Sequence, residues 1–151
     1  MIFSLEQNTF RNNNGVAVSV KRAKITDTNS KYLKNNSPSN GSCLNLASET
    51  SYTGSHIEFD QNESANKGGA VLVTTNSSFI CTSCYFTTNN ATDTGSKGGA
   101  LYLESDSRTE LSSCTFDGNK AAIGSAYFMT TSITDDSISS ISNTTFTNNE
   151  V

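Results

Sequence analysis

The sequence predicts an all-β solenoid in which short parallel strands stack coil upon coil, and three observations support this prediction. The phrase Lys-Gly-Gly-Ala, followed by three apolar residues, occurs at 67–73 and again at 97–103. A second phrase, an aromatic residue followed three positions later by Asn, occurs six times in the 151 residues. Near these phrases apolar residues recur with a period of two, which is typical of strands.

The aromatic–Asn phrase sets the length of the repeat. Its aromatic residues are 22, 27, 27, 30 and 30 positions apart, and they are Phe10, Tyr32, Phe59, Phe86, Phe116 and Phe146. Each of the last five lies 15 to 20 positions after a small residue; the small residues are Ala17, Cys43, Ala70, Ala100 and Ala126. The other half of the repeat varies from 7 to 14 positions. We therefore expect about five coils of 22–30 residues with one variable loop each.

Each small residue is followed by a predicted strand. The strands cover 18–20, 44–46, 71–73, 101–103 and 127–129, and the first and third residue of each should form inward columns. A turn and a second strand follow, ending at the inward-pointing aromatic residue. The Asn three positions later should occupy a corner in left-handed geometry, and the stacked Asn residues should form an amide ladder.

These elements together predict a right-handed parallel β-helix of the pectin-lyase-like class. Leucine-rich repeats need a different leucine spacing, and helical repeats need a period of 3.6 residues, which the sequence lacks. Residues 1–151 are expected to form a single β-helix domain. No polar capping segment is visible at either end, so we expect this domain to be a segment of a longer repeat protein.

Composition and charge exclude several classes of function. The net charge is −4 and no run of basic residues occurs, which argues against nucleic acid as a partner. No apolar stretch approaches the roughly 20 residues that a membrane-spanning helix needs. The start of the sequence lacks the features of a signal peptide. We expect neither a cofactor nor a metal, because the Cys-x-x-Cys pair at 81–84 has no second pair to complete a zinc site.

The paired phrases resemble those of a known family. Gly-Gly-Ala followed by Val or Leu, alternating with Phe-x-x-Asn, is similar to the repeat pair of the chlamydial polymorphic membrane proteins and of similar surface β-helix proteins. The resemblance extends over about residues 10–149. It implies a β-helical module of a surface-exposed adhesin, and hence an extracellular or cell-surface location.

The cysteines allow more than one interpretation. Cys84 and Cys114 both lie two positions before an aromatic residue, so stacking should place them in adjacent coils about 4.8 Å apart. That spacing is within the reach of a disulfide. Cys81 lies on the same strand as Cys84. The alternatives are a disulfide within this group of three, with Cys84–Cys114 as the stacked pair, and a set of small buried side chains.

Six Asn-x-Ser/Thr sequons occur, about as many as this composition gives by chance. In a secretory pathway, the predicted acceptors are Asn40, Asn76 and Asn143, because these three lie in turns. Asn35 and Asn62 belong to the predicted ladder and should be shielded.

A candidate contact surface lies on the outer face of the first predicted strand. The residues between the two inward positions are Ser19, Asn45, Leu72, Tyr102 and Phe128, so the column changes from polar to apolar along the stack. An apolar stripe of Leu72, Tyr102 and Phe128 would mark a contact site. The alternative is that a loop of the same chain covers it.

Two functions of different class follow. The first is a non-catalytic structural or adhesive module that contacts other protein chains, including copies of itself, in a surface layer or fibre. The second is a carbohydrate-active β-helix that binds or cleaves a glycan. Asp60 and Asp117 occupy equivalent positions but Thr87 separates them, so the sequence shows no stacked carboxylate pair. We therefore expect the chain not to be an enzyme.

Overall fold

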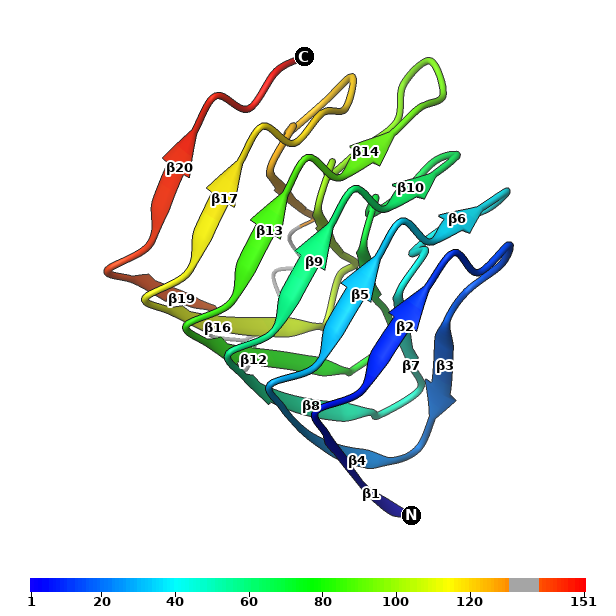
Figure 1. The fold of residues 1–151 in the computed structure, drawn as a ribbon, viewed down its shortest axis with the longest axis vertical. Coiled ribbons are helices and arrows are strands. Elements are labelled where there is room, and N and C mark those ends of the chain that lie inside the picture. Colours follow the sequence, from blue (N-terminus) through cyan, green and yellow to red (C-terminus); the bar gives the residue numbers. More distant parts are fainter. Residues whose placement is uncertain (131–138) are drawn as a thin grey trace.

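Parallel strands stack into a solenoid of about five coils, as the computed structural model of the chain shows (Figure 1). The structure describes residues 1–130 and 139–151. Within these residues every strand pairing is parallel and no helix occurs. The predicted all-β parallel solenoid is therefore confirmed.

Each coil contributes one strand to each of three long sheets, and some coils contribute to a fourth, short sheet. The first sheet contains β3 (Val18–Lys21), β7 (Leu44–Ala47), β11 (Val71–Val73), β15 (Leu101–Leu103) and β18 (Tyr127–Met129). The second contains β1 (Ile2–Glu6), β4 (Lys24–Thr28), β8 (Ser51–Ser55), β12 (Ser78–Thr82), β16 (Arg108–Ser112) and β19 (Ser140–Ser142). The third contains β2 (Thr9–Arg11), β5 (Lys31–Leu33), β9 (Glu58–Asp60), β13 (Tyr85–Thr87), β17 (Thr115–Asp117) and β20 (Thr145–Thr147). The fourth contains β6 (Asn36–Ser37), β10 (Glu63–Ser64) and β14 (Asn90–Ala91).

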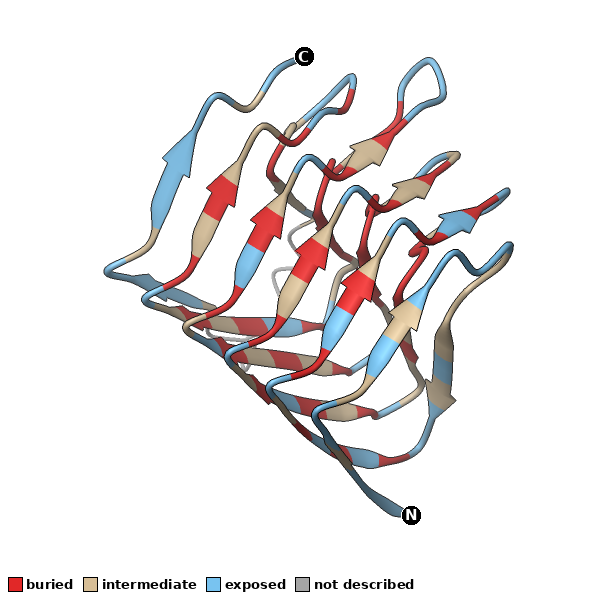
Figure 2. Cartoon of the chain, viewed as in Figure 1, coloured by how far each residue is buried: buried red, intermediate tan, exposed pale blue. Residues whose placement is uncertain are grey.

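The interior is filled by columns of side chains that repeat from coil to coil. Strands of the second sheet alternate between buried and more exposed residues, which is visible as stripes in Figure 2. In the first sheet, Val71 pairs with Leu44 and Leu101, and Val73 pairs with Leu46 and Leu103. These six residues are fully buried, as is Ala100, which precedes Leu101. The two predicted inward columns are confirmed in the middle coils, whereas Met129 at the end of the second column is 37% exposed.

The predicted aromatic column is a continuous stack of rings. The rings belong to Phe10, Tyr32, Phe59, Phe86, Phe116 and Phe146, and successive centroids are 4.8, 5.0, 4.7, 4.4 and 4.9 Å apart. Neighbouring planes are within 14° of parallel. Rings in the middle coils are fully buried, whereas Phe146 at the end of the stack is 45% exposed. The stack thus runs through every coil and joins each to the next.

An asparagine ladder runs beside the aromatic stack, as predicted. Asn35 Nδ2 donates to Asn62 Oδ1 at 3.0 Å, and Asn62 Nδ2 donates to Asn89 Oδ1 at 2.9 Å. The same bond joins Asn13 to Asn35, Asn89 to Asn119 and Asn119 to Asn149. Each of the amides from Asn35 on also donates to a backbone carbonyl of an aromatic residue in an earlier coil. The ladder satisfies polar groups at the corner that would otherwise be buried without partners.

The predicted backbone geometry of the ladder residues is wrong. The left-handed residue is the one before each ladder Asn, namely Asn12, Lys34, Gln61, Thr88, Gly118 and Asn148, with φ from 50° to 63°. The ladder position therefore selects Asn for its side-chain amide, which donates and accepts at once. Left-handed geometry falls on a neighbour that tolerates several residue types.

The two glycines of the Lys-Gly-Gly-Ala phrase have different roles. Gly68 and Gly98 adopt φ of 63° and 68°, which glycine accommodates without steric cost. Gly69 and Gly99 are needed for space, because a Cβ on either would overlap backbone atoms of the next coil. The phrase therefore combines a left-handed turn with close contact between two coils.

Candidate contact surface

The outward column of the first sheet has the register that the sequence predicts. Leu72 pairs with Asn45 on one side and Tyr102 on the other, and Tyr102 pairs with Phe128. The Tyr102 and Phe128 rings stack with centroids 5.5 Å apart and planes inclined by 13°. The apolar side chains thus form one continuous stripe, which we call the Leu72–Phe128 stripe.

The predicted exposure of the Leu72–Phe128 stripe is wrong for two of its three residues. Leu72 is 5% exposed and Tyr102 is 3% exposed, whereas Phe128 is half-buried. The chain itself provides the cover, since the turn that enters each strand passes over the outer face of the first sheet. A Cβ placed on Gly41 would be 2.8 Å from the Leu72 Cβ, and one on Gly124 would be 3.0 Å from the Phe128 Cβ.

Two lysines of the repeated phrase complete this cover. Lys67 Nζ lies 4.9 Å from the centre of the Tyr102 ring, and Lys97 Nζ lies 5.2 Å from that of Phe128. Both distances are within the range of cation–π attraction. Each lysine thus covers the aromatic ring on the following coil, so the alternative of a covering loop describes this face correctly.

Glu104 holds the first of these lysines in place. Its carboxylate accepts a hydrogen bond from Lys67 Nζ at 3.0 Å, and both side chains are about one-third exposed. Partial burial works against the charged ammonium, but the hydrogen bond and the negative charge of Glu104 outweigh it and raise the Lys67 pKa. Lys67 is therefore charged at neutral pH and keeps its position over Tyr102.

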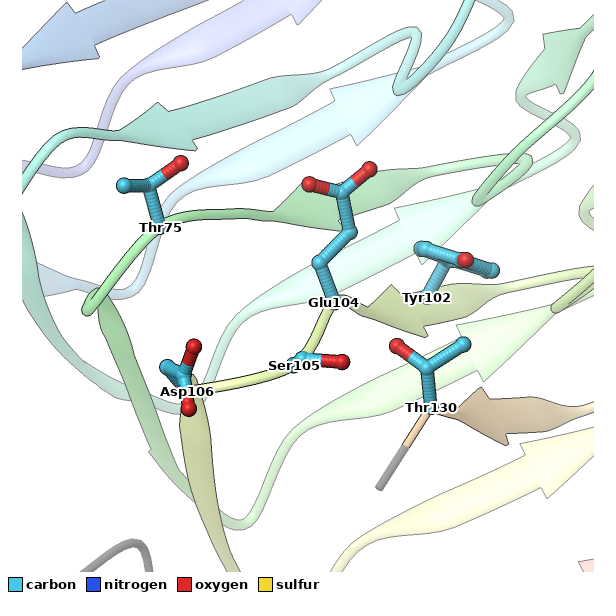
Figure 3. Close-up of a pocket in the computed structure, with 6 residues that line it drawn as sticks. All are labelled: Thr75, Tyr102, Glu104, Ser105, Asp106 and Thr130. Carbon is cyan, nitrogen blue, oxygen red and sulfur yellow. The ribbon is translucent and has the colours of Figure 1, made fainter. Parts of the chain in front are cut away.

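A polar cleft of about 340 Å³ opens beside the covered stripe. Its lining, drawn in Figure 3, consists of Thr75, Tyr102, Glu104, Ser105, Asp106 and Thr130. The hydroxyl groups of Thr75, Ser105 and Thr130 and the carboxylates of Glu104 and Asp106 give the cleft a polar lining. Tyr102 is the aromatic residue among the described lining residues, and it is buried, so its ring offers little face on which a sugar could stack.

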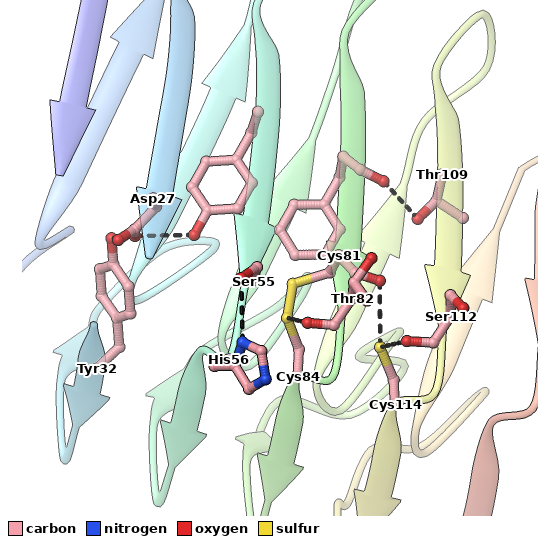
Figure 4. The surroundings of a disulfide bond; sticks show 12 residues. Asp27, Tyr32, Ser55, His56, Cys81, Thr82, Cys84, Thr109, Ser112 and Cys114 are labelled. Carbon is pink, nitrogen blue, oxygen red and sulfur yellow. Dashed lines mark hydrogen bonds between the residues drawn. A yellow bond between two sulfur atoms is a disulfide. The ribbon is translucent and has the colours of Figure 1, made fainter. Parts of the chain in front are cut away.

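The structure corrects the predicted disulfide. Cys84 is bonded to Cys81, with Cα atoms 6.0 Å apart, and Cys114 is a buried free thiol (Figure 4). Cys84 and Cys114 do lie in adjacent coils, since Tyr85 and Thr115, the residues that follow them, are register partners. The pairing differs because Ser83, with φ of 55°, turns the chain sharply between Cys81 and Cys84. Both side chains then point into the interior and meet.

The fourth cysteine lies apart from these three. Cys43 occupies the column of small residues, and burial raises the pKa of its thiol to about 12. It therefore matches the interpretation of a small buried side chain.

A buried polar cluster escaped prediction. The Asp27 carboxyl group is fully buried, and its Oδ2 accepts hydrogen bonds from the Tyr32 hydroxyl at 2.8 Å and the Tyr52 hydroxyl at 2.9 Å (Figure 4). Its Oδ1 has no hydrogen-bond partner among the described residues. Burial, reinforced by nearby negative charge, raises the pKa of both tyrosines. The sequence feature that could have predicted this cluster is the presence of Tyr, in place of Phe, in two aromatic columns.

The neighbouring coils show what this cluster replaces. Leu5, next to Asp27 in β1, and Phe59 and Phe79, next to Tyr32 and Tyr52, are the apolar counterparts.

We expect Tyr52→Phe to lower the free energy of unfolding by about 1.5–3 kcal/mol, because it removes a hydrogen bond to a buried carboxyl group. The triple change Asp27→Leu, Tyr32→Phe and Tyr52→Phe should be neutral or stabilising. Urea denaturation measures both, and equal losses in the two proteins would contradict this interpretation.

The sequons differ in how far they are available. Asn76 and Asn143 are exposed in left-handed turns, while Asn40 is half-buried and its Oδ1 accepts a hydrogen bond from the Lys67 backbone amide at 3.0 Å. The ladder residues Asn35 and Asn62 are fully buried, so their predicted shielding is confirmed. Whether any of the three predicted acceptors carries a glycan stays a prediction.

No group of three or more His, Cys, Asp or Glu side chains within 1–130 and 139–151 is arranged to hold a metal ion. In the same ranges there is no helix with the length and apolarity needed to cross a membrane.

The fold and its repeat define the chain as a parallel β-solenoid built from paired Phe-x-x-Asn and Gly-Gly-Ala phrases. Residues 56–74 match the family model of the Chlamydia polymorphic membrane protein repeat. This stretch contains Phe59-x-x-Asn62 and Gly68-Gly69-Ala70, so the match rests on one complete pair of phrases. No curated protein and no solved structure matches the chain.

Proposed function

We propose that the chain is a non-catalytic structural or adhesive module of an extracellular or cell surface and that it acts through contacts with other protein chains. The likeness to the polymorphic membrane protein repeat supports the surface location. A stack of coils joined by an aromatic column and an amide ladder is a rigid support, and its outer faces are long and flat. The function then depends on which outer face makes the contact.

The outer face of the third sheet supports this proposal best. Within residues 4–128, Tyr85 and Ile123 are the exposed large hydrophobic residues, and Tyr85 is 53% exposed on β13 in the middle of that sheet. Tyrosine is enriched in protein interfaces because it combines a large apolar area with a hydroxyl group. The exposed ring of Tyr85 is the single observation that carries the proposal.

The charges around Tyr85 favour a second copy as the partner. Arg11 lies at the β2 edge of the third sheet, and Lys31 on β5 is paired at 2.7 Å with Glu58, the register neighbour of Tyr85. Asp60 and Asp117 lie on β9 and β17. Two copies facing each other across a twofold axis would place the basic end of one face against acidic residues of the other. The Tyr85 rings would lie near the centre of that contact. Copies of this chain could thereby join in a surface layer.

Sedimentation equilibrium over a range of concentrations tests this contact. We expect the wild-type chain to dimerise, and Tyr85→Lys to raise the dissociation constant about tenfold or more, as expected for the loss of an interface centre. Thr82→Lys is the matched control, since it adds the same charge at an exposed position on the second sheet. A wild-type chain that stays monomeric throughout, or an equal effect of both changes, would contradict the contact at this face.

The polar cleft favours a second candidate, a carbohydrate-active protein. Glu104 and Asp106 place two carboxylates beside the hydroxyl groups of Ser105 and Thr130. A panel of oligosaccharides followed by NMR tests this alternative. Saturable shifts of the Ser105 and Thr130 amides that Glu104→Gln abolishes would support it, and unchanged spectra would exclude glycan binding at the cleft.

A further inference from the structure

Three cysteines of the interior meet where the second sheet turns into the third. Cys81 lies on β12, Cys84 immediately precedes β13, and Cys114 immediately precedes β17 in the next coil. All three side chains are at most 1% exposed. The Cys114 thiol donates to the Cys81 carbonyl oxygen at 3.3 Å and to the Ser112 carbonyl oxygen at 3.4 Å (Figure 4). A free thiol is therefore held against a disulfide-bonded pair.

The register places Cys84 and Cys114 beside each other in successive coils. Thr115, which follows Cys114, donates its amide to the Cys84 carbonyl oxygen at 2.9 Å. Neighbouring strands lie about 4.8 Å apart, which is within the Cα spacing that disulfides accept. Cys84 thus has two partners within reach: Cys81 in its own coil and Cys114 in the next.

We propose that Cys81, Cys84 and Cys114 form an internal thiol–disulfide exchange site, in which Cys84 bonds alternately to Cys81 and to Cys114. The Cys114 thiolate attacks the Cys84 sulfur, the new Cys84–Cys114 bond forms, and the Cys81–Cys84 bond breaks. Cys81 leaves as a thiolate and takes up the proton that Cys114 lost. One disulfide and one thiol are present before and after, so the exchange needs no external oxidant or reductant.

The exchange would change what the bond constrains. The Cys81–Cys84 disulfide closes a loop within one coil, whereas Cys84–Cys114 would link two successive coils covalently. A bond that closes the longer loop restricts the unfolded chain more. The site can therefore convert a local bond into a bond between coils.

Burial controls how fast this exchange runs. Burial raises the pKa of the Cys114 thiol, although backbone hydrogen bonds partly oppose the rise. The thiolate is then scarce at neutral pH, so exchange should be slow while the coils are closed. Its rate should increase about tenfold for each pH unit below the Cys114 pKa, because the thiolate fraction increases in that proportion.

The experiment uses the full chain with the substitution Cys43→Ala, because alanine is the residue at the equivalent position of the other coils. The protein is equilibrated at several pH values without added thiol or oxidant, quenched with acid, alkylated and digested, and its linked peptides are identified by mass spectrometry. We expect the Cys84–Cys114 peptide beside the Cys81–Cys84 peptide, with a rate that rises with pH. Finding only the Cys81–Cys84 peptide at every pH would overturn the proposal.

Two variants separate exchange inside the chain from other reactions. Cys114→Ser should lose the Cys84–Cys114 peptide completely while it retains the Cys81–Cys84 bond. Cys81→Ser, treated with oxidised glutathione, should form the Cys84–Cys114 bond. If its two thiols instead stay free or bind only glutathione while its circular dichroism matches that of the parent, the two sulfurs do not reach each other and the proposal fails.

Discussion

Gly99→Ala should destabilise the chain by at least about 4 kcal/mol, a magnitude reserved for severe steric or burial defects. A Cβ on Gly99 would overlap the Ser125 carbonyl oxygen and would be 2.6 Å from the Lys120 carbonyl oxygen. These are backbone atoms of the next coil, so relief requires the two coils to move apart. That movement would disturb the hydrogen bonds by which Ala100 and Leu101 pair with the next coil. Urea denaturation followed by circular dichroism measures the loss.

Gly95→Ala is the control for Gly99→Ala. Gly95 has a φ of 88° and no atom within 4 Å of the position that a Cβ would take. Its replacement should therefore cost only the conformational strain of a left-handed residue, about 1–2 kcal/mol. Similar losses in the two variants would show that the coils are not in close contact at Gly99.

The second large effect is expected for Phe86→Ala, at about 3–5 kcal/mol. Phe86 is fully buried and stacks between Phe59 at 4.7 Å and Phe116 at 4.4 Å, with the edge of Phe79 at 6.2 Å. Its removal leaves a cavity that the rigid neighbouring rings cannot fill, and it interrupts the stack in the middle of the solenoid.

Phe146→Ala provides the comparison, because Phe146 belongs to the same column but is 45% exposed and stacks on one side only. We expect a clearly smaller loss of unfolding free energy there, measured by the same denaturation. A loss as large as that of Phe86→Ala, or none in either protein, would contradict the role of the column.

The aromatic column and the amide ladder could be predicted from the sequence because each depends on a single position in the repeat. Phe59 and Phe86 occupy equivalent positions, and parallel register then places them in contact. Asn62 and Asn89 also occupy equivalent positions of successive repeats, so the same reasoning predicts their contact in the ladder. The same residue type at one position of each repeat is therefore enough to predict the stack, and the spacing of the phrases is enough to find that position.

The cover over the Leu72–Phe128 stripe could not be predicted in the same way. It depends on the path of the chain before each strand, which is set by the left-handed turns at Gly68 and Gly98. The spacing of the motifs shows that a loop exists but not that it folds back over the sheet. The sequence shows that Lys67 and Lys97 occupy equivalent positions in the repeated phrase. Their position over an aromatic ring of the next coil, however, depends on the path of the chain before each strand.

The disulfide was misassigned for a related reason. The stacking rule pairs residues at equal positions of successive coils, and it therefore favoured Cys84 with Cys114. The bond to Cys81 arises from a local turn at Ser83, where the backbone leaves the strand geometry that the rule assumes. Local turns of this kind compete with stacking at every corner, and the sequence gives no general way to rank the two.

The claim on which the rest depends is that successive repeats stack in register, one coil per strand spacing. Spin labels on Thr26→Cys and Ser140→Cys test it most directly, because these exposed residues belong to one outward column of the second sheet, on β4 and β19. Four strand spacings separate them, so electron spin resonance should give one narrow distance distribution centred near 19 Å between the backbone sites. A broad distribution, or a centre far from this value, would show that the repeats do not stack in this register.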